Sequence, residues 1–310
     1  MNKKFSVLIP VFNSSKTIGL LITKIKNVLQ KLEYKIILVN DSSTDDTDEQ
    51  CKELYQNNQS KIIYIKLKKN FGEHNAVYAG LNYIYGDRVF IIDDDFQNDP
   101  DELIKMINYS YNNNFDVIYS KYKKKKHSII RNFFSKINDL TANAILNKPK
   151  NIYLSSFKCI KKDVVDLIIK YTNTNIYIDG MIFEITSKIG QIEVSHNERA
   201  SGKSNYNFFK LLKLYSNMVF GFSIKPLRYI AIIGIILFIF SLIIGGIIIF
   251  EKLFISDVPL GYSSLIISII FFSSVQLIFI GVLSEYVGKI LKNSSNAPQY
   301  SIDQVYKKDD

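Results

Sequence analysis

The chain has 310 residues, 47% of them hydrophobic, which is enough for one domain with an ordinary buried core plus an appendage. Its net charge of +10 suits an anionic partner, and two long apolar segments make that partner a membrane face rather than nucleic acid. Only two cysteines occur, Cys51 and Cys159, both in segments expected to be cytosolic. We therefore expect buried thiols, with neither a disulfide nor a cysteine-bound metal.

The first 120 residues alternate short apolar runs with helical patterns, which predicts an α/β, Rossmann-like domain. Its sheet should be mostly parallel and covered by helices on both faces. No signal peptide is expected, because Pro10 interrupts the opening "MNKKFSVLIPVF". Asp99 and Pro100 predict a helix start, as N-cap and first helical residue. The predicted strands cover 5–12, 34–40, 61–67, 88–93, 115–122 and 152–160, and the predicted helices 16–32, 45–55, 73–85 and 100–112.

Polar side chains collect where these strands end. Asn13 follows the first strand, Asn40 and Asp41 the second, Asn70 the third, and three consecutive aspartates the fourth. In open α/β sheets the ligand lies beyond the carboxyl ends of the strands, so this pattern predicts a binding site. Neither G-x-G-x-x-G nor G-x-x-x-x-G-K-[ST] follows any strand, which disfavours dinucleotide dehydrogenases and P-loop NTPases.

The three aspartates, Asp93 to Asp95, predict a metal site. Asp93 and Asp95 are two positions apart, so on an extended strand end they face one side and Asp94 faces the other. Two carboxylates on one side suit Mg²⁺ or Mn²⁺, which leaves coordination positions for diphosphate oxygens, and the lack of a nearby Cys or His disfavours zinc. The alternative is a capping cluster for the next helix, which explains one aspartate but hardly three.

Two later segments are predicted to meet the membrane surface. "KYKKKKHSIIRNFFSKI", from Lys121, mixes lysines and Arg131 with apolar residues; it is either a solvated basic loop or a segment that lies on an anionic membrane or grips a phosphate. Residues 205–222 place apolar side chains at helical spacing just before the first apolar segment. A core helix is the alternative there, and an interfacial helix is favoured.

Tyr229–Phe250 and Ser263–Ser284 are each 22 residues long without a charge, enough to cross a bilayer as helices. A pair of this length disfavours buried soluble helices. Lysines and an arginine flank the pair, so the positive-inside rule places both chain ends in the cytoplasm. We expect a cytosolic domain over 1–203, a juxtamembrane helix over 204–228, two spans over 229–292 (about 229–250 and 263–284) and a poorly ordered cytoplasmic tail over 293–310.

Four motifs in fixed order carry a family resemblance: "SVLIPVFN", "IILVNDSSTDDT", "KNFGEHNAVYAGLNYIYGDRVFIIDDDFQNDP", and "ERASGKSNYNFFKLLKLYSNMVFGFSIKPLR" before the two spans. The chain resembles the family 2 glycosyltransferases of GT-A fold, in particular the polyprenyl-phosphate group of bactoprenol glucosyltransferases and dolichol-phosphate mannose synthases. The resemblance implies an inverting enzyme that moves a sugar from a nucleotide-sugar to a polyprenyl phosphate, such as undecaprenyl phosphate, for cell-envelope glycans. UDP is favoured over GDP, and a homo-oligomer stays open.

The resemblance also implies roles for single residues. Asp93 and Asp95 would hold the metal on the diphosphate, Asp41 would bond the base, and Gln97 would lie near the donor sugar. Asp95 or Asp179 would be the catalytic base, with a structural role equally open for Asp179. The nucleotide pocket would include Pro10, Phe12 and Asn13, and the acceptor phosphate would meet Arg199, Lys203, Ser204 and Tyr206. Arg131, from the basic segment, is a further candidate for that phosphate.

The chain departs from the family pattern at several positions. Ser14 and Ser15 stand where the family often has Glu, and Phe157–Lys158 stands for its "FR", preceded by Ser156 where some relatives carry an acid. Two alternatives remain. A processive polysaccharide synthase is disfavoured because the chain lacks Trp and therefore Q-x-x-R-W. A non-catalytic membrane-anchored scaffold is disfavoured because the aspartates and Arg199 are all present.

Overall fold

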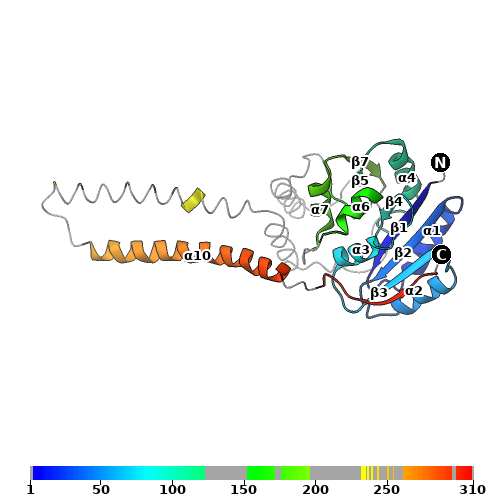
Figure 1. Cartoon of the computed structure of the whole chain (residues 1–310), viewed down its shortest axis with the longest axis horizontal. Helices are drawn as coiled ribbons and strands as arrows, with labels where there is room; N and C mark the ends of the chain where they lie inside the picture. The colour runs from blue at the N-terminus through cyan, green and yellow to red at the C-terminus, as the bar shows by residue number, and fades with distance from the viewer. Residues whose placement is uncertain are drawn as a thin grey trace. The chain divides into compact units, whose positions relative to one another are not determined.

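The computed structural model describes residues 3–122, 152–171, 176–195, 261–294 and 298–308, and scattered positions between 232 and 254. The chain divides into two compact units. One comprises Met1–Leu211 with Asn296–Asp310 and contains a sheet with helices on both faces (Figure 1). The other comprises Leu212–Ser295 and contains the helix α10 (Tyr262–Ser294).

The sheet has eight strands in the order β7-β5-β6-β4-β1-β2-β3-β8. Strands β1 to β4 pair in parallel, and β5 pairs in parallel with β7, whereas β6 and β8 run against their neighbours. The expected mostly parallel α/β sheet is therefore confirmed. The strands are β1 (Lys4–Val11), β2 (Glu33–Asn40), β3 (Ile62–Leu67), β4 (Arg88–Ile91), β5 (Val117–Tyr122), β6 (Lys158–Lys161), β7 (Ile189–Val194) and β8 (Ile302–Tyr306).

Helices pack on both faces because alternate residues of the strands point to opposite sides. Phe5, Val7 and Ile9 of β1 join one buried cluster with the apolar sides of α1, α2 and α4. On the other face α3 lies so close that a Cβ on Gly80 would meet Leu8 Cδ1 at 2.2 Å, so a larger residue there would force the core side chain of Leu8 to move. These helices are α1 (Ile18–Val28), α2 (Thr47–Gln56), α3 (Glu73–Leu81) and α4 (Glu102–Asn112), followed by α6 (Lys162–Ile168) and α7 (Ile178–Ile185).

Two local predictions are corrected. The helix expected to start at Pro100 begins at Glu102, with Asp101 as its N-cap residue. Asp99 instead accepts hydrogen bonds from Lys24 Nζ at 2.6 Å and from the backbone N–H of Asp101 at 3.1 Å. The strand expected over 152–160 is limited to β6, which begins at Lys158. Cys51 and Cys159 are both buried, as expected, and both are free thiols.

The C-terminal segment is the main surprise of the fold. The tail was expected to be poorly ordered, but β8 pairs antiparallel with β3, and Tyr306 lies opposite Tyr64 in the register. The backbone N–H of Lys68 also donates to the carbonyl of Ser301 at 2.9 Å. After α10 the chain therefore returns to the sheet of the first unit and adds its edge strand, β8, next to β3.

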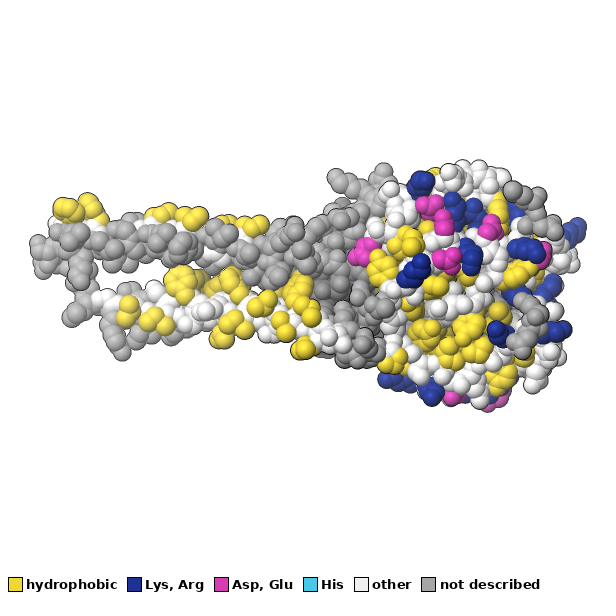
Figure 2. Space-filling view, viewed as in Figure 1, with side chains coloured by type: hydrophobic (Ala, Val, Ile, Leu, Met, Phe, Trp, Pro, Cys, Tyr) yellow, Lys and Arg dark blue, Asp and Glu magenta, His cyan; other side chains and the backbone are white. Residues whose placement is uncertain are grey.

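α10 is the one helix among the described residues that is long and apolar enough to cross a membrane, over Phe271–Gly288. Its apolar side chains, such as Leu277 and Ile278, are exposed, and Figure 2 shows hydrophobic side chains along it. Only scattered positions of the first expected span, 229–250, are described, so the two-helix hairpin is not confirmed. The expected juxtamembrane helix over 204–228 lies outside the described residues.

Candidate functional site

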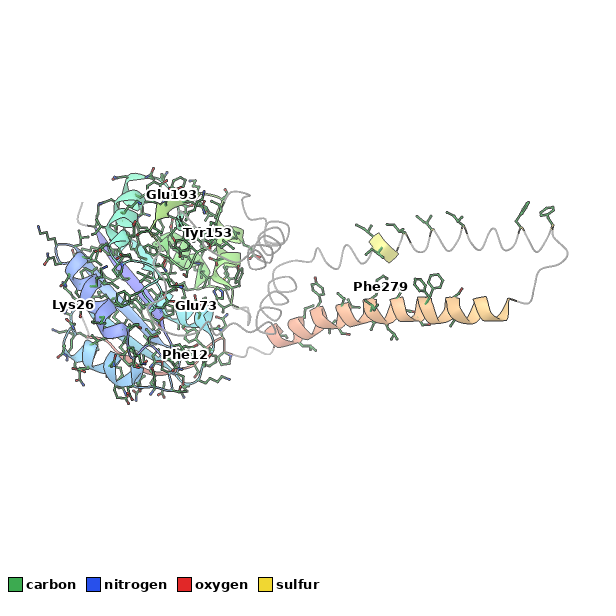
Figure 3. The ribbon with its side chains drawn as sticks, turned by 180° about the vertical axis from the view of Figure 1, so that it is seen from behind. Phe12, Lys26, Glu73, Tyr153, Glu193 and Phe279 are labelled. Atoms are coloured by element: carbon green, nitrogen blue, oxygen red, sulfur yellow. The ribbon has the colours of Figure 1, made fainter. Side chains whose placement is uncertain are left out.

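The carboxyl ends of the parallel strands bring the predicted polar residues to one edge of the sheet. β1 ends before Phe12 and Asn13, β2 before Asp41, and β4 before the aspartates that begin at Asp93. Because these strands pair in parallel, their ends lie at the same edge. Figure 3 labels two residues at this edge. Phe12 is the first residue after β1, and Glu73 is the first residue of α3. Pro10 itself lies buried within β1, opposite Val39.

The loops after β1 and β2 are held together by hydrogen bonds. The backbone N–H of Asn13 donates to Ser43 Oγ at 3.0 Å, and Asn13 Oδ1 accepts from the N–H of Thr44 at 2.8 Å. The N–H of Ser14 donates to Thr47 Oγ1 at 2.9 Å. Side chains rather than a β-ladder fix these loops, so the edge is a preorganised surface.

Backbone strain is concentrated at the same edge. Three described residues other than glycine have a positive φ: Asn13 at 55°, Ser42 at 59° and Phe96 at 62°. They lie in the loops after β1, β2 and β4 respectively. Left-handed backbone costs free energy in residues with a Cβ and persists where the surroundings impose it, most often at binding and catalytic sites.

Asp41 fixes the turn that leads into α3. Its side chain is 3% exposed, and its two oxygens accept the backbone N–H groups of Phe71 and Gly72, each at 2.8 Å. Gly72 adopts φ +94°, which a residue with a Cβ would take only under strain. Burial raises the pKa of Asp41, although these two hydrogen bonds oppose the shift. That Asp41 also bonds a nucleotide base stays a prediction.

Asp94 connects the fourth strand to the first. Its Oδ2 accepts the backbone N–H of Phe12 at 3.1 Å and the hydroxyl of Ser14. Ser14, one of the two serines that stand where the resemblance predicts a Glu, is therefore a partner of Asp94 in this chain. The sequence predicted only that Asp94 faces away from Asp93 and Asp95, and it gave Asp94 no role. Its partner Ser14 is 80 positions away in the chain, so no local sequence pattern indicates the contact.

Asp93 is held in place by two side chains that the sequence did not single out as site residues. Asn98 Nδ2 donates to Asp93 Oδ2 at 3.1 Å, and so does the hydroxyl of Ser156. Asn98 is 1% exposed and in turn accepts the hydroxyl of Tyr122 at 2.8 Å. Only β5, β6 and the loop after β4, folded together, bring these groups to one point.

Burial raises the pKa of Asp93 to about 8, and the negative charge of Glu73 adds to the shift against the hydrogen bond from Ser156. Burial also raises the pKa of Asp94 to about 6, opposed by Ser14 and the N–H of Phe12. Carboxylates gathered in this way are stabilised when a cation joins them. Glu73, in the first turn of α3, is a member of this acidic group that sequence reasoning missed.

The donor set fits a divalent cation that shares its coordination with a ligand. Asp93 and Asp95 would supply carboxylates from the same loop, and Asp95 Oδ1 also accepts the N–H of Gln97 at 3.1 Å, which shapes that loop. Within the described ranges, no group of three or more His, Cys, Asp or Glu side chains could enclose a metal. Hard cations bound by one or two carboxylates complete their shell with water and phosphate oxygens.

Asp179 has a buried cation as its partner. Its side chain is 10% exposed and forms an ion pair with Lys158, whose side chain is 5% exposed, and Tyr119 donates to Asp179 Oδ1 at 2.8 Å. Burial alone would raise the pKa of Asp179, but Lys158, His74 and Tyr119 together lower it. A carboxylate committed to a buried ammonium is a poor proton acceptor, so this geometry favours the structural interpretation.

The predicted acceptor-binding residues lie outside the described parts of the chain: Arg131, Arg199, Lys203, Ser204 and Tyr206. Their placement at the edge stays a prediction.

Comparison with known proteins gives a consistent result. The family model described as "Glycosyl transferase family 2" matches residues 6–168. An undecaprenyl-phosphate 4-deoxy-4-formamido-L-arabinose transferase of Photorhabdus laumondii is 27% identical, over 98% of this chain and 94% of that protein. Its namesake from Salmonella choleraesuis is 28% identical over 98% and 94%.

Among solved structures, glucosyl-3-phosphoglycerate synthase from Mycobacterium tuberculosis, crystallised with Mn²⁺, UDP-glucose and phosphoglyceric acid, is similar in fold. The TM-score is 0.53 at 15% identity, covering 71% of this chain and 78% of that one.

Proposed function

Because this chain belongs to glycosyl transferase family 2, we propose that it transfers a sugar from a nucleotide-sugar to undecaprenyl phosphate. The acceptor is supported by relatives named for it that match nearly the whole chain. The observation that carries the proposal is the acidic edge, where half-buried Asp93 is followed by Asp94 and Asp95, and where the charge of Glu73 adds to the rise in the pKa of Asp93. Such a site suits the cation and diphosphate of a nucleotide-sugar.

We assign the metal to Asp93 and Asp95. A divalent cation bound there, Mg²⁺ or Mn²⁺, would neutralise charge on the leaving diphosphate. Asn98 and Ser156 hold Asp93 toward that position, and the loop hydrogen bond to Gln97 holds Asp95. Preorganised ligands of this kind avoid reorganisation during the reaction.

The donor nucleotide is assigned to the loops after β1 and β2. Phe12 is 37% exposed at this edge and offers an aromatic face to a base. Asn13 and Asp41 belong to the hydrogen-bonded loops beside it, and Gln97 is assigned to the donor sugar. UDP is favoured as the nucleotide, which the UDP-glucose complex of the structural neighbour supports.

The acceptor phosphate is assigned to the basic and hydroxyl side chains of Arg199, Lys203, Ser204, Tyr206 and Arg131. A phosphate monoester has a second pKa near ~6 and is largely dianionic at neutral pH, so it needs positioning more than deprotonation. In-line attack of that phosphate oxygen on the anomeric carbon would invert the sugar. Asp95 stays the candidate base, whereas the ion pair with Lys158 argues against Asp179.

The sheet supports two membrane crossings with both termini on one side. β8 follows α10 in the chain, yet it pairs with β3, which precedes the apolar region. Strands of one sheet lie on the same side of a membrane, so the chain between β7 and β8 must cross an even number of times. α10 is long and apolar enough to be one span, and residues 229–250 are the apolar stretch that would be the other.

The test is to incubate membranes that contain the protein with undecaprenyl phosphate and a panel of UDP- and GDP-sugars, and to look for a glycolipid by mass spectrometry. The expected product is undecaprenyl phosphate carrying one sugar, formed by the wild type and not by Asp95→Asn. A polymer would favour a processive synthase. Nucleotide binding without any product would favour a scaffold, and either result would overturn the proposal.

A further inference from the structure

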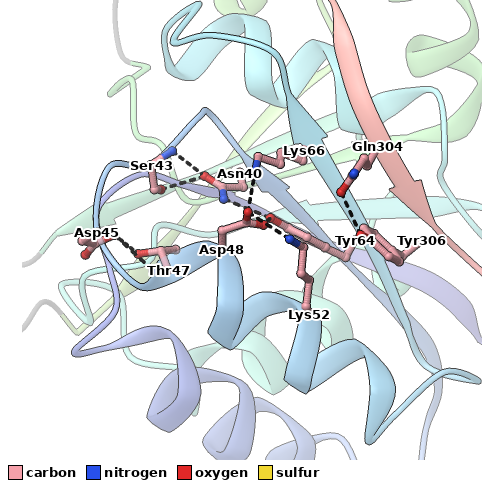
Figure 4. Close-up of polar contacts among 10 residues, drawn as sticks. All are labelled: Asn40, Ser43, Asp45, Thr47, Asp48, Lys52, Tyr64, Lys66, Gln304 and Tyr306. Carbon is pink, nitrogen blue, oxygen red and sulfur yellow. Dashed lines mark hydrogen bonds and ion pairs between the residues drawn. The ribbon is translucent and has the colours of Figure 1, made fainter.

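A chain of hydrogen bonds, buried at Tyr64 and more exposed toward its far end, runs from β3 to the loops at the acidic edge. Figure 4 draws its members from Asp48 to Ser43. Tyr64, in β3, is fully buried, and its hydroxyl donates to Asp48 Oδ1 at 2.6 Å. The same hydroxyl accepts from Asn40 Nδ2 at 2.9 Å. Asn40 Oδ1 accepts both the N–H and the hydroxyl of Ser43, at 2.9 and 2.7 Å. Ser43 Oγ finally accepts the backbone N–H of Asn13 at 3.0 Å.

This chain of hydrogen bonds is important because it ends at the loops that we assign to the nucleotide. Its last two members, Ser43 and Asn13, are the residues that join the loops after β1 and β2. Asn13 and its neighbour Ser42 both have positive φ, so these loops depend on their hydrogen bonds to stay in an uncommon conformation. Asn40 uses its carbonyl for Ser43 and its amide for Tyr64, so the Tyr64 hydroxyl and Ser43 together fix which way that side chain is turned.

The other end of the chain of bonds is held by β8. The ring of Tyr306 stacks on Tyr64, with centroids 5.6 Å apart and planes 19° apart, and also contacts Tyr55 at 5.7 Å. The hydroxyl of Tyr306 is on the exposed side, where it donates to Gln304 Oε1 at 2.7 Å. The contact between Tyr306 and Tyr64 is therefore made by the rings. Asp48 is held in turn by Lys52, at 3.1 Å, and by Lys66. Tyr64 is thus fixed on its ring face by the C-terminal strand and at its hydroxyl by buried polar groups.

We propose that Tyr64 is a positioning residue for the donor nucleotide, and that Tyr306 of β8 holds it in place, so that the C-terminal strand sets nucleotide affinity. The inference rests on the proposed function, because it takes the loops after β1 and β2 as the nucleotide site. Neither tyrosine touches the ligand in this account. Both act through Asn40 and Ser43 on the shape of the loop.

The experiment is isothermal titration of the full-length, detergent-solubilised protein with UDP and GDP in the presence of Mn²⁺. Tyr64→Phe keeps the stacking but removes the hydroxyl, leaving Asn40 Nδ2 and Asp48 Oδ1 without that partner. We expect it to weaken nucleotide binding about 5- to 30-fold, the effect of losing buried hydrogen bonds. The KM for the donor should rise similarly, while kcat at saturating donor and the KM for the lipid stay nearly unchanged.

Two matched variants separate positioning from general stability. Tyr306→Phe keeps the ring and should bind nucleotide as the wild type does, whereas Tyr306→Ala should weaken binding in the same direction as Tyr64→Phe. Tyr78→Phe removes another buried hydroxyl, which donates to the carbonyls of Ile169 and Tyr171 at 2.9 and 2.8 Å on the opposite face of the sheet. It should lower thermal stability without changing nucleotide affinity.

The outcomes distinguish this inference from the function on which it rests. A wild type that binds neither UDP nor GDP would overturn the proposed function itself. A wild type that binds, with Tyr64→Phe lowering the melting temperature but leaving the dissociation constant unchanged, would overturn only the positioning role. Equal affinities for Tyr306→Ala and the wild type would remove β8 from the account.

Discussion

Asp179→Asn decides whether this carboxylate is a structural ion-pair partner or a catalytic base. The substitution keeps an oxygen that can accept from Tyr119 but leaves the Lys158 ammonium, 5% exposed, without its counter-charge. Removing one partner of a buried pair costs about 3–5 kcal/mol. For a domain of this size, 1 kcal/mol shifts the melting temperature by about 2–4 °C, so we expect a fall of about 6–20 °C.

The two cysteines provide the assay. Cys51 and Cys159 are 0% and 1% exposed in the sheet domain, so a fluorogenic maleimide reacts with them only as that domain opens on heating. The double variant Lys158→Met with Asp179→Asn removes both charges and should recover most of the lost melting temperature. Sugar transfer measured well below the melting temperature should persist in Asp179→Asn. An unchanged melting temperature together with abolished transfer would make Asp179 the base and refute the structural interpretation.

Further predictions concern the metal, the acceptor, the topology and pH. Asp95→Asn, or excess EDTA, should abolish transfer, and Mn²⁺ or Mg²⁺ should restore the EDTA-treated wild type; full activity in EDTA would contradict the metal site. Arg199→Ala should raise the lipid KM or lower kcat about 10- to 150-fold with nucleotide affinity nearly unchanged; the opposite pattern would place Arg199 at the donor. In intact cells an impermeant maleimide should label Asp257→Cys and not Asp303→Cys, and labelling of both would contradict the even number of crossings. Burial alone would raise the pKa of Asp48, but hydrogen bonds from Lys66, Tyr64 and Lys52 hold it below its ordinary value. Ionised Asp48 therefore stabilises the fold fully above its unfolded pKa of about 3.9, and this stabilisation is lost as pH falls through the lower pKa of the folded state. The melting temperature of Asp48→Asn should accordingly fall less steeply at acid pH than that of the wild type.

The sequence by itself determined the α/β class, most strands and helices, and the edge of the sheet at which the candidate site residues gather. Continuous apolar runs such as β1 and β2 can be buried only in a sheet covered on both faces, and parallel strands must end together. For that reason Asn13, Asp41 and Asp93 could be assigned to one edge from their positions after strands. The order of the four motifs indicated the family, which the family model matching residues 6–168 confirms.

Only the tertiary structure decided which groups those residues meet. The sequence of β8 resembles a polar tail, because an edge strand is half solvated. Its partner β3 is more than 200 positions earlier in the chain, so no local pattern indicates the pairing. The contacts of Asp94 with Ser14, of Asp93 with Ser156, and of Asp179 with Lys158 join segments far apart in sequence. Such contacts have no period or spacing, because they depend on how strands order themselves in the sheet. The sequence could therefore name the carboxylates of the candidate site, whereas folding determined which of them accept a hydroxyl and which pairs with a buried lysine.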